Sequence, residues 1–467
     1  MPSRASLCST LITQNSISKD ESSVPSSRRF RSQEPKSKDG ITAEPISIDP
    51  NLTQADQLVL EYLLHNAANS DPSSKEHNQR KHDDHRGAEE ELLEKLERMN
   101  DENSPDFEPT VFCTWDLKDI PARPAILRTL LNSYIQWASH VTRRPTDVVF
   151  ITHLALYFTT SLPSALYLFF YNFTWLHGVS HAAMSAYYFG TYTLMRHNHI
   201  HNNGILSESW WMLDTLFPYV LDPLMGHTWN SYYYHHVKHH HVEGNGPGDL
   251  STTLRLQRDE ISSLLYYVSR FMFFIWLDLP LYFIRTGKYS HALRAAFWEF
   301  SSYMFMLLAT QYSLKASAFV LLVPFSLIRL GLMIGNFGQH AFVDEVDPDS
   351  DYRSSITIID VPSNRFCFND GYHTAHHINS LRHWRDQPLS FIKSQDAYVR
   401  GRALVFRNID YLEITYRLMR KDYEHLARCL VPISHEQKSM SQEEREGMLR
   451  RKTRRFSEDE IGRKFGQ

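Results

Sequence analysis

Residues 148–170 read VVFITHLALYFTTSLPSALYLFF and residues 173–195 read FTWLHGVSHAAMSAYYFGTYTLM, and neither run contains Lys, Arg, Asp or Glu. A helix of either length crosses about 30 Å of hydrocarbon. The second run is rich in Ala, Gly and Ser, and such small residues let membrane helices approach closely. Further apolar windows follow at 264–284, 293–312 and 316–337. Five such windows are rare in a soluble protein, so the sequence predicts an all-α integral membrane protein.

Composition narrows the function classes. The 467 residues include 53 acidic and 49 basic side chains, which gives a formal net charge of -4. This balance argues against a nucleic-acid-binding protein, which needs a basic excess to neutralise phosphates. The 4 cysteines form no CxxC pair, which argues against a thiolate zinc site or a disulfide scaffold. The unusual feature is the number of histidines, 25.

Many of these histidines fall into short motifs that flank the apolar windows. The motifs are His197-x-x-x-His201, His236-x-x-His239-His240, Asn336-x-x-x-His340 and His373-x-x-His376-His377. At this histidine frequency an HxxHH pattern is expected only about 0.07 times in a chain of this length, yet it occurs twice. The repeated pattern therefore indicates a function.

The spacing indicates metal binding. On a helix, positions i, i+3 and i+4 lie on one face, so each motif presents two or three imidazoles in one direction. Neutral imidazole is a good ligand for iron, copper or zinc, and nine histidines with Asn336 are too many for one ion. We therefore predict a site for two metals. The motifs contain neither the Glu-x-x-His pairs of soluble di-iron bundles nor the HExxH of zinc proteases.

Other polar residues near the motifs have competing interpretations. His235 or His241 could replace a neighbour in the second motif if that segment is not a regular helix. We expect His177 and His181 to be helix-packing residues, because they lie about 30 Å along the helix from His197. Carboxylates that could orient a ligand imidazole are Asp249, Asp344, Asp360 and Asp370, although a solvated loop position is the commoner role for any one of them.

The motifs HNHIH (197–201), HVKHH (236–240) and HTAHH (373–377), in that order, resemble the histidine boxes of the membrane fatty acid desaturase and hydroxylase superfamily. The resemblance covers roughly residues 147–400. NFGQH (336–340) resembles an extra ligand pair found in acyl-CoA desaturases. The resemblance implies two non-haem irons, with O2 as co-substrate, at the cytosolic face of the membrane, which we expect to be that of the endoplasmic reticulum.

The resemblance also implies a subtype and a partner. The sequence has no His-Pro-Gly-Gly motif, so it lacks a fused cytochrome b5 domain, and we expect a separate electron donor such as cytochrome b5 with its reductase. Front-end desaturases usually begin the third box with Gln, whereas His373 stands here. The first box lacks the His-Glu start that is common in alkane hydroxylases. These differences favour an acyl-lipid or acyl-CoA desaturase, with a lipid hydroxylase as the alternative.

Topology places a constraint on the spans. His340 and the third box share a membrane side with the first two boxes only if the chain crosses an even number of times between them, yet three apolar windows lie there. We expect residues 264–284, which contain Arg270, Asp278 and Pro280, to lie at the interface or to re-enter. This leaves about four spans, interfacial helices and a cytosolic helical cap. Residues 126–141 form either a surface helix or a core helix.

The ends of the chain are polar. Residues 1–105 are rich in Ser, Lys, Glu and Asp, and we predict a disordered N-terminal region. Residues 106–432 then form the membrane domain with its cap, and residues 433–467 form a charged flexible tail.

Two other functions remain open from the sequence. A histidine-rich metal transporter would need ligands near mid-membrane, where only His153, His177 and His181 stand. The same three residues leave an intramembrane haem carrier as a remote alternative. Within the desaturase hypothesis, we predict that His239→Ala or His376→Ala abolishes turnover and lowers iron content.

Overall fold

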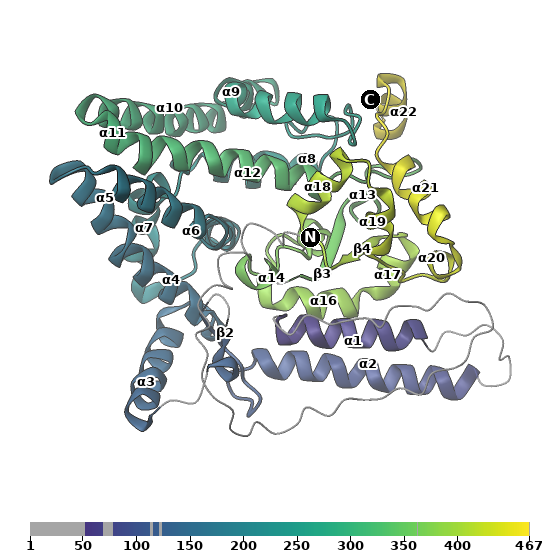
Figure 1. Cartoon of the computed structure of the whole chain (residues 1–467). Coiled ribbons are helices and arrows are strands. Elements are labelled where there is room, and N and C mark those ends of the chain that lie inside the picture. The colour runs from purple at the N-terminus through teal and green to yellow at the C-terminus, as the bar shows by residue number, and fades with distance from the viewer. Residues whose placement is uncertain (1–51, 69–77, 113–114, 121–123, 362, 467) are drawn as a thin grey trace. The chain divides into compact units, whose positions relative to one another are not determined.

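The computed structural model describes residues 52–68, 78–112, 115–120, 124–361 and 363–466. These described residues form one compact unit. The described part is mainly helical, as the sequence predicts (Figure 1). Its N-terminal elements are α1 (Gln54–Ala68), α2 (Asn78–Asn100), β1 (Thr110–Phe112), β2 (Trp115–Asp116) and the 3-10 turn η1 (Leu117–Asp119).

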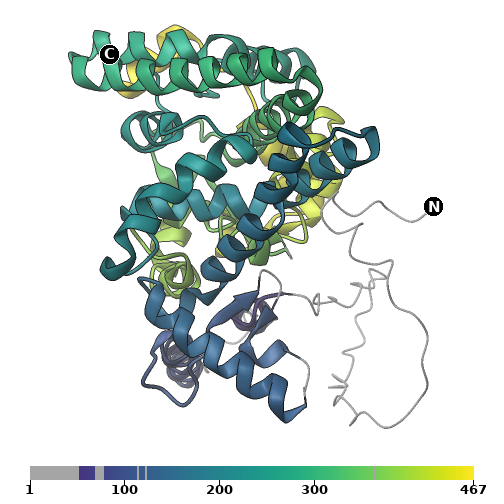
Figure 2. The same ribbon diagram turned by 90° about the vertical axis from the view of Figure 1, so that its left-hand side faces the viewer.

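The apolar part of the chain follows. Its first elements are α3 (Ala125–Val141), η2 (Pro145–Asp147), α4 (Val148–Thr159), α5 (Ser161–Phe170), α6 (Trp175–Asn202), η3 (Glu208–Trp210) and α7 (Trp211–Leu224). After a π-helix, η4 (Tyr233–His240), and a short turn, α8 (His241–Glu243), come α9 (Ile261–Arg285), α10 (Tyr289–Tyr312), α11 (Leu314–Ser317), the π-helix η5 (Ala318–Leu322) and α12 (Val323–Gln339). Helix α9 packs against both α10 and α12 (Figures 1 and 2).

Among the described residues, three helical stretches are long and apolar enough to cross a membrane: Pro145–Phe170, Ile261–Arg285 and Leu314–Gln339. The placement of 264–284 at the interface is therefore not supported, because α9 has the length and composition of a span. The predicted windows 173–195 and 293–312 do not reach this standard. Four spans are thus not confirmed.

Helices α9 and α10 expose large apolar side chains, among them Phe273, Phe274, Leu293, Phe297 and Leu308. Exposed apolar surface of this extent marks a surface that contacts lipid or protein rather than water. Helix α3, which covers the predicted helix 126–141, has features of both a surface helix and a core helix. Its Ile126 and Leu130 are exposed, whereas Ile135, Ala138 and Val141 are buried.

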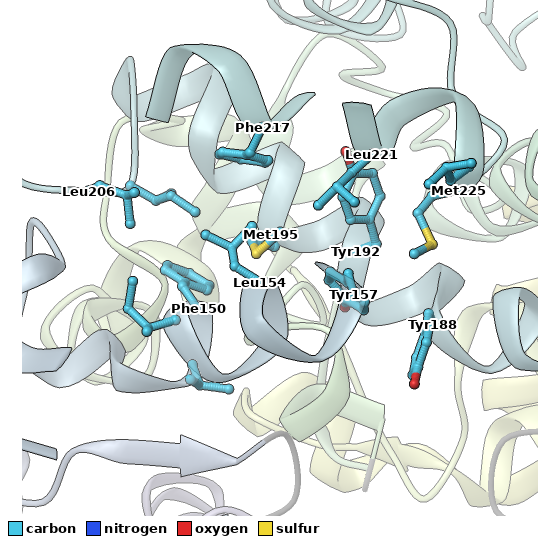
Figure 3. Close-up of a cluster of buried hydrophobic side chains, with 14 of the residues drawn as sticks. Phe150, Leu154, Tyr157, Tyr188, Tyr192, Met195, Leu206, Phe217, Leu221 and Met225 are labelled. Carbon is cyan, nitrogen blue, oxygen red and sulfur yellow. The ribbon is translucent and has the colours of Figure 1, made fainter. Parts of the chain in front are cut away.

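A core of buried side chains holds α4, α6 and α7 together (Figure 3). Tyr157 on α4 contacts the rings of Tyr188 and Tyr192 on α6, and Leu221 on α7 belongs to the same cluster. Met195 on α6 is fully buried in this core, two residues before His197. Packing therefore fixes the direction in which the end of α6 points.

The cap is built around a small sheet in which β3 (Ile356–Asp360) pairs parallel with β4 (Leu404–Arg407), and β4 pairs antiparallel with β5 (Leu430–Val431). The helices and turns around it are α13 (Asp351–Ser354), α14 (Ser363–Phe366), α15 (His373–Ile378), η6 (Trp384–Asp386), α16 (Gln387–Lys393), α17 (Gln395–Arg400), α18 (Tyr411–Met419) and α19 (Tyr423–Arg428). Helix α12 packs against α18, and at Gly338 a Cβ atom would lie 2.4 Å from the Tyr411 carbonyl oxygen. This close approach joins the end of α12 to the cap.

Both chain ends differ from the sequence prediction. Residues 1–51 lie outside the described residues, but α1 and α2 form helices that pack on β3 and α16 within the region predicted to be disordered. The predicted flexible tail contains α20 (His435–Ser439), α21 (Gln442–Lys452) and α22 (Glu458–Phe465). Leu449, Phe456 and Ile461 of this tail are buried. A few apolar residues in a polar segment suffice for docking when a preformed cap receives them.

Candidate metal centre

The described residues bring nine histidines from five segments together in two neighbouring groups. Two lie on α6, two on η4, one at the start of α8, one directly after α12 and three on α15. The first group contains His197, His201, His236, His241 and His376, and the second contains His240, His340 and His377. His373 adjoins the second group, with its Nε2 3.1 Å from that of His340.

In the first group four Nε2 atoms form a closed ring. His197 lies 2.8 Å from His236 and 3.0 Å from His376, and His241 completes the ring at 3.1 and 2.9 Å from the same two residues. Neighbouring rings stand 73–87° apart, whereas His236 and His376, opposite each other, are nearly parallel at 6°. The four imidazoles thus point inward at a common centre.

This ring fits a bound cation better than it fits hydrogen bonding. A neutral imidazole carries one N–H, so a ring of four nitrogens can satisfy at most two of its four contacts by hydrogen bonds. A cation at the centre would accept all four lone pairs. Adjacent ligands at right angles, with bonds of about 2.1 Å, lie about 3.0 Å apart, which matches the spacing seen here.

His201 stands beside this ring as a fifth imidazole. It is buried, and neither of its ring nitrogens has a hydrogen-bond partner among the described residues. Its ring meets those of His241 and His376 nearly edge-on, at centroid distances of 4.7 Å. A buried polar group without a partner is costly, so His201 also fits a ligand.

The second group is oriented by carboxylates. The Nδ1 of His240 donates to Asp249 Oδ2 at 2.7 Å, and the Nδ1 of His377 lies 3.5 Å from Asp351 Oδ1. The Nε2 atoms of both histidines are buried and have no hydrogen-bond partner within the described residues. A carboxylate that holds one ring nitrogen and leaves the other free is the usual support of a metal-binding histidine.

The two groups adjoin each other. The ring centroids of His241 and His377 are 5.0 Å apart, and those of His236 and His240 are 5.6 Å apart. Burial lowers the pKa of His236, His241 and His376 well below the usual value, and the charges of neighbouring histidines lower it further. These imidazoles are therefore neutral at physiological pH, which is the form that binds metals.

The second box differs from its predicted register. Sequence reasoning chose His236, His239 and His240, but this segment is a π-helix in which the His241 N–H donates to the His236 carbonyl, an i to i+5 hydrogen bond. The wider turn brings His236, His240 and His241 onto one face. His239 instead turns toward α9, where its ring meets Tyr282 and its Nε2 accepts from the Leu250 N–H at 3.0 Å. His239 joins neither group.

Asn336 is the other predicted ligand outside the two groups. It lies on α12 one turn before His340, and its Oδ1 accepts a hydrogen bond from the hydroxyl of Tyr267 on α9. The Tyr267 hydroxyl oxygen also lies 3.1 Å from the Ser251 carbonyl oxygen. The assignment of Asn336 as a ligand stays a prediction.

Four other histidines lie outside the two groups, and His177 and His181 have the helix-packing role expected of them. His177 and His181 both contact the Ser164 hydroxyl, at 2.8 and 2.9 Å, and so join α5 to α6. The Nε2 of His199 lies 3.0 Å from the Asp214 carbonyl oxygen, away from both groups. His235 likewise belongs to neither group.

Among the carboxylates considered from the sequence whose side chains the structure describes, only Asp249 hydrogen-bonds a grouped histidine. Burial would raise the pKa of Asp249, but the charge and hydrogen bond of His240 hold it well below the usual value. Asp370 lies 3.8 Å from His197 Nδ1, and burial raises its pKa to about 7. Asp344 instead pairs with Lys452 at 2.8 Å, and the side chain of Asp360 lies outside the described residues. Nothing in the sequence indicated that Asp351 would contact a grouped histidine.

A cavity begins beside the first group. It is lined by apolar side chains of α9 and α12 together with Tyr232 and His235, and the Tyr232 ring stacks on His236 at a centroid distance of 5.1 Å. One wall carries the buried pair Glu299 and Arg329, which join α10 to α12. The arrangement places an apolar space next to the candidate metal centre.

Comparison with known proteins gives one result. A family model described as fatty acid desaturase matches residues 173–402. The match includes all four histidine motifs. Neither a curated protein nor a solved structure gives a significant match.

Proposed function

We propose that this chain, which belongs to the membrane fatty acid desaturase and hydroxylase superfamily, uses O2 and two electrons to introduce a double bond into a fatty acyl chain. The observation that carries the proposal is the convergence of nine histidines in two adjacent groups inside the matched region. The two groups adjoin each other, with imidazole ring centroids 5.0 and 5.6 Å apart, and would hold the two irons that this oxidation uses.

We assign the first position to His197, His201, His236, His241 and His376, and the second to His240, His340, His373 and His377. An iron pair held there would supply the oxidation of an unactivated C–H bond by O2. The chain itself keeps the imidazoles neutral by burial, and Asp249 and Asp351 fix the orientation of two of them.

The cavity beside Tyr232 supports an apolar substrate. Ile275, Leu279 and Ile328 line it, so an apolar group placed there would be removed from water. Exclusion of water also protects the reacting carbon from side reactions. We propose that the acyl chain approaches the candidate metal centre from this side, past Tyr232 and His235, which line the cavity.

The remaining assignments rest on the family. We propose a multi-pass protein of the endoplasmic reticulum with its metal centre on the cytosolic side. Electrons would come from a separate donor such as cytochrome b5, because the sequence contains no His-Pro-Gly-Gly motif.

The decisive experiment is expression of the full chain in a host of defined lipid composition, followed by mass spectrometry of the lipids. New double bonds would support desaturation, whereas new hydroxyl groups would identify a lipid hydroxylase of the same superfamily. Metal analysis of the purified protein provides the second test. About two irons per chain without haem absorbance are expected, whereas zinc together with transport activity would contradict the proposal.

A further inference from the structure

The third histidine box is connected to a helix that lies more than 300 residues earlier in the chain. Asp56 on α1 is fully buried, and its Oδ1 accepts a hydrogen bond from the Tyr372 hydroxyl at 2.5 Å. Tyr372 is also fully buried and directly precedes His373. This contact joins the N-terminal helix to the segment that contributes three histidines to the candidate metal centre.

A second hydrogen bond of the same carboxylate reaches the turn before the box. Asn364 Nδ2 donates to Asp56 Oδ2 at 3.2 Å and to the Ile358 carbonyl oxygen on β3 at 3.0 Å. The Oδ1 of Asn364 accepts from the Gly371 N–H at 3.1 Å. Asp56 therefore holds both ends of a turn that leads from the cap sheet into α15.

The turn has little freedom to adopt another path. At Gly371 a Cβ atom would lie 2.2 Å from Asn364 Oδ1 and 2.5 Å from the Ile358 carbonyl oxygen, so only glycine fits. The Ile358 N–H donates to the Gly371 carbonyl oxygen at 2.7 Å, and the first turn of α15 begins with the His376 N–H donating to the Tyr372 carbonyl oxygen at 3.0 Å. A shift of Tyr372 would therefore move the backbone that carries His373 and His376.

We propose that Asp56 is a positioning residue of the metal centre and that α1 acts through Tyr372 to hold the third histidine box in register. This proposal rests on the proposed function, because it assigns the box to metal binding. A buried carboxylate that bonds two side chains is costly to remove, since both donors lose their partner. An aspartate in an otherwise polar N-terminal segment thus supports a site that lies far away in sequence.

The test compares three variants of the full chain, purified in detergent. Asp56→Ala removes the carboxylate, Tyr372→Phe removes only the hydroxyl, and Leu63→Ala truncates a buried side chain of α1 two turns away and serves as the matched control. The readouts are backbone hydrogen exchange of residues 372–378 and iron bound per chain. The first readout requires neither turnover nor bound iron.

We expect Asp56→Ala to accelerate exchange in residues 372–378 by about tenfold and to lower bound iron, with Tyr372→Phe changing both in the same direction. Leu63→Ala should leave exchange in that segment close to the wild-type rate. Equal acceleration in Asp56→Ala and Leu63→Ala, or no acceleration in Asp56→Ala, would overturn the proposal. A wild-type protein without iron would contradict the proposed function, while the exchange comparison would still decide the role of Asp56.

Discussion

The two histidine groups achieve the same arrangement by different means. In the first group His197, His236, His241 and His376 contact one another directly, at nitrogen-to-nitrogen distances of 2.8–3.1 Å. In the second group the Nδ1 atoms of His240 and His377 contact the carboxylates of Asp249 and Asp351. The first group is therefore held by packing of its rings, whereas two histidines of the second group are also oriented by carboxylates. The two positions should respond differently to substitution.

The largest effect is expected at His241, which directly follows the π-helix η4. His241→Ala should remove one of four inward-pointing nitrogens, so activity should fall at least about 100-fold and iron should fall from about two per chain to about one. His239→Ala is the matched variant, and it should retain more iron because His239 joins neither group. Iron analysis and product formation check both. If His239→Ala instead retained less iron than His241→Ala, the HxxHH register predicted from the sequence would be the correct one.

The carboxylates of the second group should give the next largest effect. Asp249→Asn replaces the acceptor of the His240 N–H, and a loss of about 10- to 100-fold in metal affinity or activity is expected. Asp351→Asn should cost less, because Asp351 is 39% exposed and lies 3.5 Å from His377. Metal titration of the two variants measures the difference. Equal losses would show that hydrogen-bond geometry does not set the affinity.

A cation in the cap supports the second group through the backbone. Arg258 is fully buried and donates to the carbonyl oxygens of Ala341, Thr253 and Lys452, so it joins the loop after His240, the residue after His340 and the tail. Burial lowers the pKa of Arg258 to about 9. Arg258→Met should destabilise the protein by about 3 kcal/mol, because several buried carbonyls lose their donor. Thermal unfolding in detergent measures this loss, and unchanged stability would contradict the role.

The smallest effect is expected at His199, which lies between two predicted ligands in sequence. Its ring contacts the Asp214 carbonyl oxygen and Arg196 and does not enter either group. His199→Gln should therefore retain about two irons per chain and most of the activity. If His199→Gln bound less iron than Asp249→Asn, the end of α6 would differ from the arrangement described above.

Much of the candidate site follows from the sequence. Eight of the nine grouped histidines lie in the predicted motifs. The motifs could be recognised because side chains three or four residues apart share a helix face whatever the tertiary structure. His241 was only an alternative, since nothing local distinguishes a π-helix from an α-helix in the run HHVKHHH at 235–241. The roles of Asp351 and Asp56 could not be predicted, because their partners lie far away in sequence.

The sequence by itself determined the helical, apolar character of the middle of the chain and the residue types suited to a metal site, because hydropathy and helix periodicity are local properties. Only the tertiary structure decided which imidazoles share a position, which carboxylates orient them and that the polar ends dock on the cap. These outcomes depend on contacts between segments up to several hundred residues apart. The free energy of such contacts comes from burial and mutual hydrogen bonding, which no local pattern records.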